Sequence, residues 1–152
     1  MRRRRERPRQ LLRTPLAAWE RDGLKAALTK AGLPAGDVDD AHILFWRFES
    51  YEDVPVGFGG LELHGDDALL RSVLTLPPLR QIGIGSAIVS ALEAEARAHS
   101  CRAIYLLTAS HQDFFSRLGY TRCAHAKLPQ AIRDRGQAGA SAEEAAMVKH
   151  LS

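Results

Sequence analysis

The sequence predicts an α/β fold built on a mixed, mostly antiparallel sheet with helices on both faces. Residues 43–50 and 54–63 are rich in Ile, Phe, Trp and Val, and short polar turns join them to each other and to the apolar stretch at 68–76, which is typical of an antiparallel meander. Residues 83–100 then carry apolar side chains at helical spacing, and a short apolar run at 103–108 follows. Because parallel strands need a crossover between them, we expect this last strand to lie parallel to the strand at 68–76.

The segment before the meander predicts a short strand followed by helices. Residues 9–13 are compatible with a first strand. Thr14 and Pro15 have the residue types of a helix start, an N-cap followed by proline at the first helical position. Apolar residues then recur at helical spacing but are interrupted by Gly23, so we expect two short helices or one kinked helix, the second part starting at Asp22 and stopped by Gly32 and Pro34.

Beyond residue 126 the sequence carries fewer signals. Residues 129–133 predict a helical turn, and residues 145–150 predict a final strand. The glycine-containing stretch between them, at 136–141, is interpreted as a loop.

Composition and charge indicate one domain with a basic tail. The 152 residues are 45% hydrophobic and 26% charged, which is ordinary for a single globular domain, predicted here to span 10–152. The first thirteen residues hold seven arginines and one glutamate, so the remainder is net negative although the whole chain is +3. We expect residues 1–9 to be a disordered tail, and any contact with nucleic acid to be confined to it.

The sequence does not indicate a membrane span, a signal peptide or a metal site. There is no apolar run of membrane-spanning length, and no apolar segment follows the N-terminal arginines, so a cytoplasmic protein without a membrane partner is expected. Cys101 and Cys123 are isolated, and the histidines show no ligand spacing. No metal site is therefore predicted.

Residues 80–86 predict a phosphate-binding loop. Glycines at 83 and 85 let an anion approach the backbone, the helix that follows offers unpaired N–H groups, and Arg80 adds a forked positive charge. A dinucleotide fingerprint would need a small residue where Ile88 stands. A Walker A motif would need Gly-Lys-Ser/Thr, which does not follow.

The pattern Arg80-x-x-Gly83-x-Gly85 resembles the R/Q-x-x-G-x-G/A acetyl-CoA loop of the GNAT family of N-acetyltransferases. The strand at 103–108 and the aromatic segment at 114–120, which ends in a Gly-Tyr step, follow in the order typical of that family. The resemblance covers about residues 43–126. It implies the GNAT fold, in which the one parallel pair of strands parts into a V-shaped cofactor cleft. It also implies acetyl transfer from acetyl-CoA, as co-substrate, to a primary amine.

The resemblance implies cofactor contacts from a strand, from the loop and helix start, and from the segment after the next strand. The residues at those positions are Val73, Leu74, Thr75, Arg80, Gln81, Ile82, Gly83, Ile84, Gly85, Ser86, Thr108, Phe114, Phe115 and Arg117. Many relatives carry a tyrosine at the position of Phe115, where the hydroxyl can serve the departing thiolate. Without it, solvent protonates the thiolate, the enzyme is slow, or catalysis has been lost.

Glu62 and Arg71 are predicted to lie on one face of the sheet. A tight hairpin at Gly65 and Asp66 puts Glu62 opposite Leu69 and diagonal to Arg71. One interpretation is a structural cross-strand ion pair. The other makes Glu62 the catalytic base, directly or through water, and Arg71 a clamp for an acidic group on the acceptor.

Five segments, at 60–62, 68–72, 105–108, 114–120 and 128–133, together look like the GNAT branch associated with arsenic-resistance operons. That resemblance implies a small, acidic amine acceptor, an amino acid bearing an arsenic or phosphorus group, with Arg71 and Arg133 as anion binders. The cysteine-containing C-terminal segment of the branch is not matched, because residues 136–146 carry no cysteine. The substrate therefore stays open.

Two non-enzymatic interpretations also stay open. One is a catalytically weak or inactive GNAT module that binds acyl-CoA without turnover. The other is a module that its arginine-rich tail tethers to RNA or DNA. The sequence leaves the oligomeric state undecided, a homodimer included.

Overall fold

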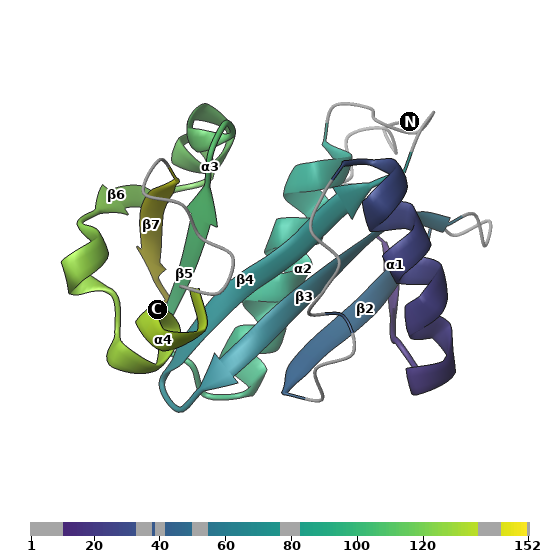
Figure 1. The fold of residues 1–152 in the computed structure, drawn as a ribbon, viewed down its shortest axis with the longest axis horizontal. Helices are drawn as coiled ribbons and strands as arrows, with labels where there is room; N and C mark the ends of the chain where they lie inside the picture. Colours follow the sequence, from purple (N-terminus) through teal and green to yellow (C-terminus); the bar gives the residue numbers. More distant parts are fainter. Residues whose placement is uncertain are drawn as a thin grey trace, which may run out of the picture. The chain divides into compact units, whose positions relative to one another are not determined.

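The computed structural model describes residues 11–32, 38, 42–49, 55–76, 83–136 and 144–151. Its elements, with η marking a 3₁₀ helix, are β1 (Leu12–Pro15), η2 (Ala18–Glu20), α1 (Arg21–Lys30), β2 (Ile43–Glu49), β3 (Pro55–His64), β4 (Asp67–Thr75), α2 (Ile84–Ala98), β5 (Ala103–Thr108), α3 (Gln112–Arg117), β6 (Thr121–Cys123), η3 (His125–Lys127), α4 (Gln130–Gly136) and β7 (Ala145–His150) (Figure 1).

The strands confirm the predicted mixed sheet. Their order is β1-β2-β3-β4-β5-β7-β6. The parallel pair is β4 with β5, in register from Asp67 opposite Ala103 to Leu69 opposite Tyr105, and α2 is the crossover that the sequence requires between them. The other recorded pairings, of β1 with β2 and of β7 with β5 and β6, are antiparallel.

The chain divides into two compact units, Met1–Gly60 with Ser72–Leu92, and Leu61–Arg71 with Glu93–Ser152. The elements β3, β4 and α2 contribute residues to both. The tail predicted at 1–9 lies outside the described residues, and the predicted domain boundary stays a prediction. Among the described residues, no helix has both the length and the apolar character needed to cross a bilayer.

The start of the first unit differs from the prediction. Thr14 lies opposite Arg47 and Pro15 opposite Trp46 in an antiparallel pairing of β1 with β2. The expected helix start at these two residues is therefore wrong, and the first helical residue is Ala18. Proline has no N–H to donate, but β1 is the last strand in the sheet order, and an edge strand tolerates this loss. Pairing with β2 therefore outweighs the local capping signal.

Two helical segments follow, as predicted. The 3₁₀ turn η2 leads directly into α1, which starts at Arg21, one residue before the predicted start at Asp22, so Gly23 lies inside the first turn of α1. An added Cβ at Gly23 would meet nothing within 4 Å, which lets this residue sit inside the helix. The predicted stop is confirmed, because Gly32 follows α1 with a φ of +77°, in the left-handed region that glycine favours.

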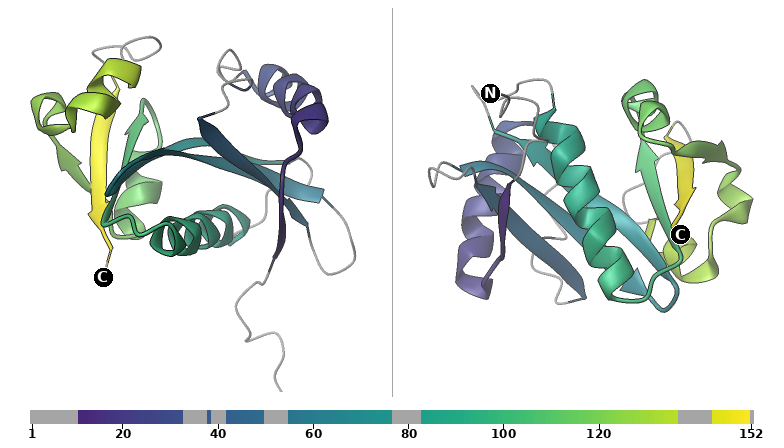
Figure 2. Two further views of the ribbon diagram at one scale, coloured as in Figure 1. Left: turned by 90° about the horizontal axis from the view of Figure 1, so that it is seen from below. Right: turned by 180° about the vertical axis from the view of Figure 1, so that it is seen from behind.

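Helices cover the two faces of the sheet in this unit, α1 on one and α2 on the other (Figure 2). The core on the α1 face consists of Leu16, Leu24, Leu28, Val38, Ile43, Phe45 and Leu74. Arg21 ties the chain after α1 to this core by donating to the carbonyls of Val38 (2.5 Å) and Ile43 (3.1 Å).

On the α2 face, glycines in β3 allow close packing. An added Cβ at Gly57 would lie 2.7 Å from a methyl carbon of Ile88 and would collide with the carbonyl oxygen of Leu74. An added Cβ at Gly59 would lie 2.7 Å from a methyl carbon of Leu92. These glycines therefore mark a close approach of strand and helix.

In the second unit, β5 pairs along its whole length with β7, from Ala103 opposite His150 to Thr108 opposite Ala145. The predicted final strand and the predicted helical turn, now α4, are both confirmed. One core cluster joins Leu69, Leu128, Ile132 and Ala146 with the partly buried Tyr105, Leu107 and Cys123.

The packing at Gly57 generates a stability prediction. We expect Gly57→Ala to lower the free energy of unfolding by about 2 kcal/mol or more, because the new methyl group meets backbone that cannot rotate away. Urea denaturation measures this change. The matched control is Gly23→Ala, where open space leads us to expect no loss and a gain of up to about 1 kcal/mol. A Gly57→Ala protein as stable as the parent would contradict the close approach.

Candidate active site

Gly83 forms the start of α2. Its φ is +100°, its carbonyl accepts the first helical hydrogen bond from the N–H of Ala87 (3.0 Å), and the hydroxyl of Ser86 also donates to it (3.4 Å). The next three N–H groups, of Ile84, Gly85 and Ser86, have no acceptor within the helix. This end of α2 therefore presents N–H donors and the positive end of the helix dipole.

Of the predicted phosphate loop at 80–86, the structure describes residues 83–86. Ile84 is buried in the core, which anchors the first turn of α2. Arg80, Gln81 and Ile82 lie outside the described residues.

Along β4, the backbone N–H and C=O groups of successive residues point alternately toward β3 and away from it. The N–H of Leu76 donates to the carbonyl of Val56 on β3 (2.9 Å). Since neighbouring residues in a strand direct their backbone groups to opposite sides, Leu74 faces β3 as Leu76 does, and Val73 and Thr75 face the other side. The side chain of Leu74 is part of the core, so any cofactor contact of Leu74 would also have to use its main chain.

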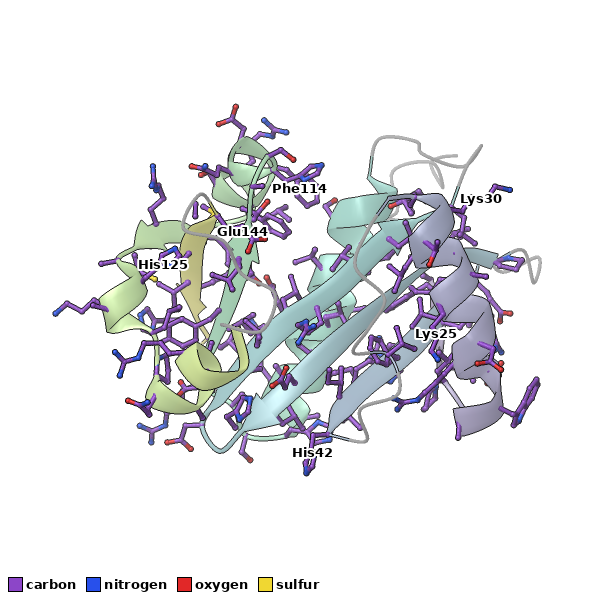
Figure 3. The ribbon with its side chains drawn as sticks, viewed as in Figure 1. Lys25, Lys30, His42, Phe114, His125 and Glu144 are labelled. Carbon is purple, nitrogen blue, oxygen red and sulfur yellow. The ribbon has the colours of Figure 1, made fainter. Side chains whose placement is uncertain are left out.

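Phe114 and Phe115 belong to an aromatic group. Phe115 is buried and packs edge to face against Phe114 (ring centroids 4.9 Å apart) and against Tyr120 (5.7 Å). Phe114, at the side of α3, is partly exposed (Figure 3). The packing role of Phe115 is established, and cofactor contact by either ring stays a prediction.

Thr108 and Arg117 bracket α3. The hydroxyl of Thr108 accepts the N–H of His111 (3.0 Å), which holds the turn between β5 and α3, and Thr108 is buried. Arg117 is the last residue of α3 and is exposed. Cofactor contact by Thr108 and by Arg117 stays a prediction.

A buried carboxylate lies near the β3–β4 hairpin. The side chain of Glu62 is 0% exposed, its Oε1 accepts from Nη1 of Arg71 (2.8 Å), and its Oε2 bonds Nε2 of His64 (2.9 Å). The predicted tight turn is present, with Gly65 at a φ of +66° between the two strands. The cross-strand ion pair is therefore confirmed, whereas catalysis by Glu62 stays a prediction. We refer to Glu62, His64 and Arg71 as the Glu62 cluster.

The sequence interpretation missed His64. It follows Glu62 by two residues on one strand, and residues at that spacing share a face of the sheet. The spacing was therefore visible, but it did not show that the two side chains bond. In the structure, the side chains of His64 and Arg71 are 20% and 21% exposed, so the cluster reaches solvent through them.

Arg133 lies on α4, where its Nη2 donates to Oε1 of Gln130 (2.6 Å). Its Nε is buried and has no hydrogen-bond partner among the described residues. Ile132 and Leu69 share one core cluster, and Leu69 and Arg71 point to the same face of β4. The helix that carries Arg133 therefore covers the sheet face that carries Arg71.

A second buried carboxylate was also missed. Glu93, 6% exposed, accepts from the hydroxyl of Tyr120 (3.0 Å) and from Nζ of Lys149 (3.2 Å to each oxygen), which also donates to the carbonyl of Leu118. Burial, together with the charge of Glu93, raises the pKa of Tyr120 far above its ordinary value. Nothing in the local sequence links residues so far apart, and this group holds the Gly-Tyr step in place.

Among the described residues, no group of three or more His, Cys, Asp or Glu side chains is arranged to hold a metal ion.

His125, in η3, lies near Glu144, the residue before β7, and its Nε2 bonds the carbonyl of Glu144 (2.6 Å) (Figure 3).

The described residues thus form a mixed α/β sheet with a parallel pair of strands, joined by a crossover helix that follows a left-handed glycine. The chain belongs to the acetyltransferase (GNAT) family, whose profile matches residues 6–120. No curated protein sequence matches it significantly.

Solved structures share this fold. N-acetylglutamate synthase from Neisseria gonorrhoeae, solved with coenzyme A and N-acetyl-glutamate, superposes with a TM-score of 0.78 at 14% identity, over 93% of this chain and 35% of that one. This chain thus spans about a third of that enzyme. A GNAT acetyltransferase from Staphylococcus aureus Mu50 has a TM-score of 0.72 at 15% identity, covering 93% and 99%. A Klebsiella pneumoniae protein, provisionally named an acyl-CoA N-acyltransferase, has 0.71 at 25% identity, covering 93% and 98%.

The ion pair of Glu62 with Arg71 generates a second stability prediction. Arg71→Leu should cost about 3 kcal/mol of unfolding free energy, because a buried carboxylate loses a charged partner. The double variant Glu62→Leu/Arg71→Leu should recover at least half of that loss, since no buried charge remains. Denaturant unfolding of the parent, Glu62→Leu, Arg71→Leu and the double variant measures the coupling. Arg102→Leu, at an exposed position, is the matched control and should change stability by less than about 0.5 kcal/mol. Additive losses would contradict the pairing.

Proposed function

We propose that this protein is a cytoplasmic N-acetyltransferase that moves an acetyl group from acetyl-CoA to the primary amine of a small, acidic metabolite or amino-acid analogue. The observation that carries the proposal is the start of α2 at Gly83, within the loop that matches the family pattern. The relative from Neisseria gonorrhoeae was solved with coenzyme A and an acetylated amino acid, which supports both the cofactor and the class of acceptor.

The cofactor would lie along the residues that the pattern predicts. The N–H groups of residues 83–86, together with Arg80, Gln81 and Ile82, would bind the pyrophosphate at the positive end of α2. Val73 and Thr75 would offer backbone groups to the pantetheine arm, as to an added strand. A backbone N–H of β4 would polarise the thioester oxygen. We further propose that Thr108, Phe114, Phe115 and Arg117 contact the cofactor, as the family pattern predicts.

The departing thiolate needs a proton, and the candidate donors are few. Phe115 has no hydroxyl. The hydroxyl of Tyr120 donates to Glu93, and its pKa is raised by burial, so it is committed to the core. We propose that solvent protonates the thiolate, whose own acidity lets it leave first.

We propose an acidic acceptor because two arginines could bind its anionic group. Arg71 and Arg133 lie on elements that share one face of the sheet, and Arg133 has a buried Nε without a partner among the described residues. Guanidinium groups bind carboxylate, phosphonate and arsonate oxygens in a forked geometry. An amino acid bearing an arsenic or phosphorus group, the acceptor class of the arsenic-resistance branch, would fit this pair.

Acetyl-CoA binding tests the cofactor assignment. Gly83→Val and Gly85→Val should each weaken binding at least about tenfold, because a side chain blocks the approach of phosphate to the backbone and, at Gly83, also strains a left-handed residue. Calorimetry measures the dissociation constant. Gly23→Val, on α1, is the matched control and should bind like the parent. Unchanged affinity in both loop variants, once folding is verified by circular dichroism, would refute the assignment.

The acceptor class is tested by thiol release over a panel of amines. Anionic amino acids and their phosphonate analogues should exceed basic peptides in kcat/KM. Arg133→Ala should raise KM for the anionic acceptors about tenfold and leave neutral amines and acetyl-CoA affinity unchanged. Faster turnover of basic peptides would refute the acidic acceptor. Tight acetyl-CoA binding with no turnover of any amine would favour a binding module instead.

A further inference from the structure

The carboxylate of Glu62 is closed to an incoming amine. Its side chain has no solvent exposure, Arg71 occupies Oε1 at 2.8 Å and His64 occupies Oε2 at 2.9 Å. A catalytic base must come within about 2.6–3.2 Å of the proton that it removes. An acceptor would first have to displace a partner from a buried charge, which is costly. Direct proton transfer from acceptor to Glu62 is therefore disfavoured by the geometry.

His64 provides the exposed side of the same cluster. An ionised carboxylate can only accept hydrogen bonds, so the bond to Glu62 requires a proton on Nε2 of His64. In a neutral imidazole, the lone pair then lies on Nδ1. Nδ1 has no hydrogen-bond partner among the described residues, and the side chain is 20% exposed.

We propose that His64 is the group that removes the proton from the acceptor amine, and that Glu62 is a positioning residue that fixes the tautomer and orientation of the imidazole. This inference rests on the proposed acetyltransferase function and names the proton acceptor of that same site. Arg71 neutralises the carboxylate, so the Glu62 cluster carries no net charge until His64 takes up a proton.

The proton balance is complete with the substrates alone. The acceptor arrives as an ammonium ion, and Nδ1 of His64 takes one proton, which frees the nitrogen lone pair. That nitrogen bonds the thioester carbon, the carbon–sulfur bond breaks, and the second proton of the nitrogen passes, through water, to the thiolate. His64 then returns its proton to solvent. The net products are the amide, the free thiol and one released proton.

Charged groups from several elements surround His64. The pKa of Asp67, at the start of β4, is raised mainly by burial and also by Asp66, and is lowered by His64 and His150, so Asp67 and His64 interact. The charged and titratable groups on the elements around His64 are Glu62 on β3, Asp66 in the hairpin, Asp67 and Arg71 on β4 and His150 on β7.

A first experiment tests the geometry without turnover. In nitrogen-15 spectra of the full chain, recorded where the ring is neutral, His64 should show the tautomer with its proton on Nε2. Glu62→Gln should shift His64 toward a mixture of tautomers, because a neutral amide holds the ring less strongly. A proton on Nδ1 in the parent protein would overturn the proposal.

A second experiment tests the chemistry with the best acceptor of the panel. His64→Gln should lower kcat about 10²-fold or more near neutrality, and its rate should keep rising with pH as free amine accumulates, while acetyl-CoA affinity stays unchanged. Added imidazole should partly restore His64→Ala. His99→Gln, at an exposed position of the second unit where the ring bonds a main-chain carbonyl, is the matched control and should keep full activity.

The double variant separates His64 from Glu62. Glu62→Gln should cost activity in the parent but little more in a His64→Gln background, because the carboxylate acts through the imidazole. A further loss of about 10²-fold there would make Glu62 the base by itself and overturn the proposal, as would full activity of a folded His64→Gln protein. A parent protein that acetylates no amine would instead refute the proposed function.

Discussion

The second unit depends on the compensation of buried charge. A carboxylate without solvent access is tolerated when charged and hydrogen-bonding partners satisfy its oxygens. Glu62 meets this requirement with Arg71 from the neighbouring strand and His64 from its own strand. Glu93 meets it with Lys149 from β7 and Tyr120 from the Gly-Tyr step. The two carboxylates thereby tie β3 to β4, and α2 to β7, at defined positions.

The start of α2 depends on main chain, whereas proton transfer depends on side chains. A helix that follows a left-handed glycine offers N–H donors whatever its side chains are. A side chain at one strand position, in contrast, can be exchanged without changing the sheet. Phe115 has no hydroxyl, and its ring packs against Phe114 and Tyr120.

Local signals allowed much of the fold, and the pairing of Glu62 with Arg71, to be predicted. The meander, the crossover helix, the parallel strand and the tight turn at Gly65 all depend on patterns within about twenty residues, and the structure has them. The pairing of Glu62 with Arg71 followed from counting across that turn. Thr14 and Pro15 show the opposite case, because their capping pattern was overruled by pairing with β2, a strand that the local window does not contain.

The sequence by itself thus determined the class of fold, the start of the crossover helix and the strand face that carries Glu62 and Arg71. Tertiary structure decided which polar groups are buried together. The bond between His64 and Glu62 depends on the burial of the carboxylate beside the imidazole. The group of Glu93, Tyr120 and Lys149 joins residues up to 56 positions apart. Burial is a property of the packed chain, so no pattern of spacing along it could reveal these contacts.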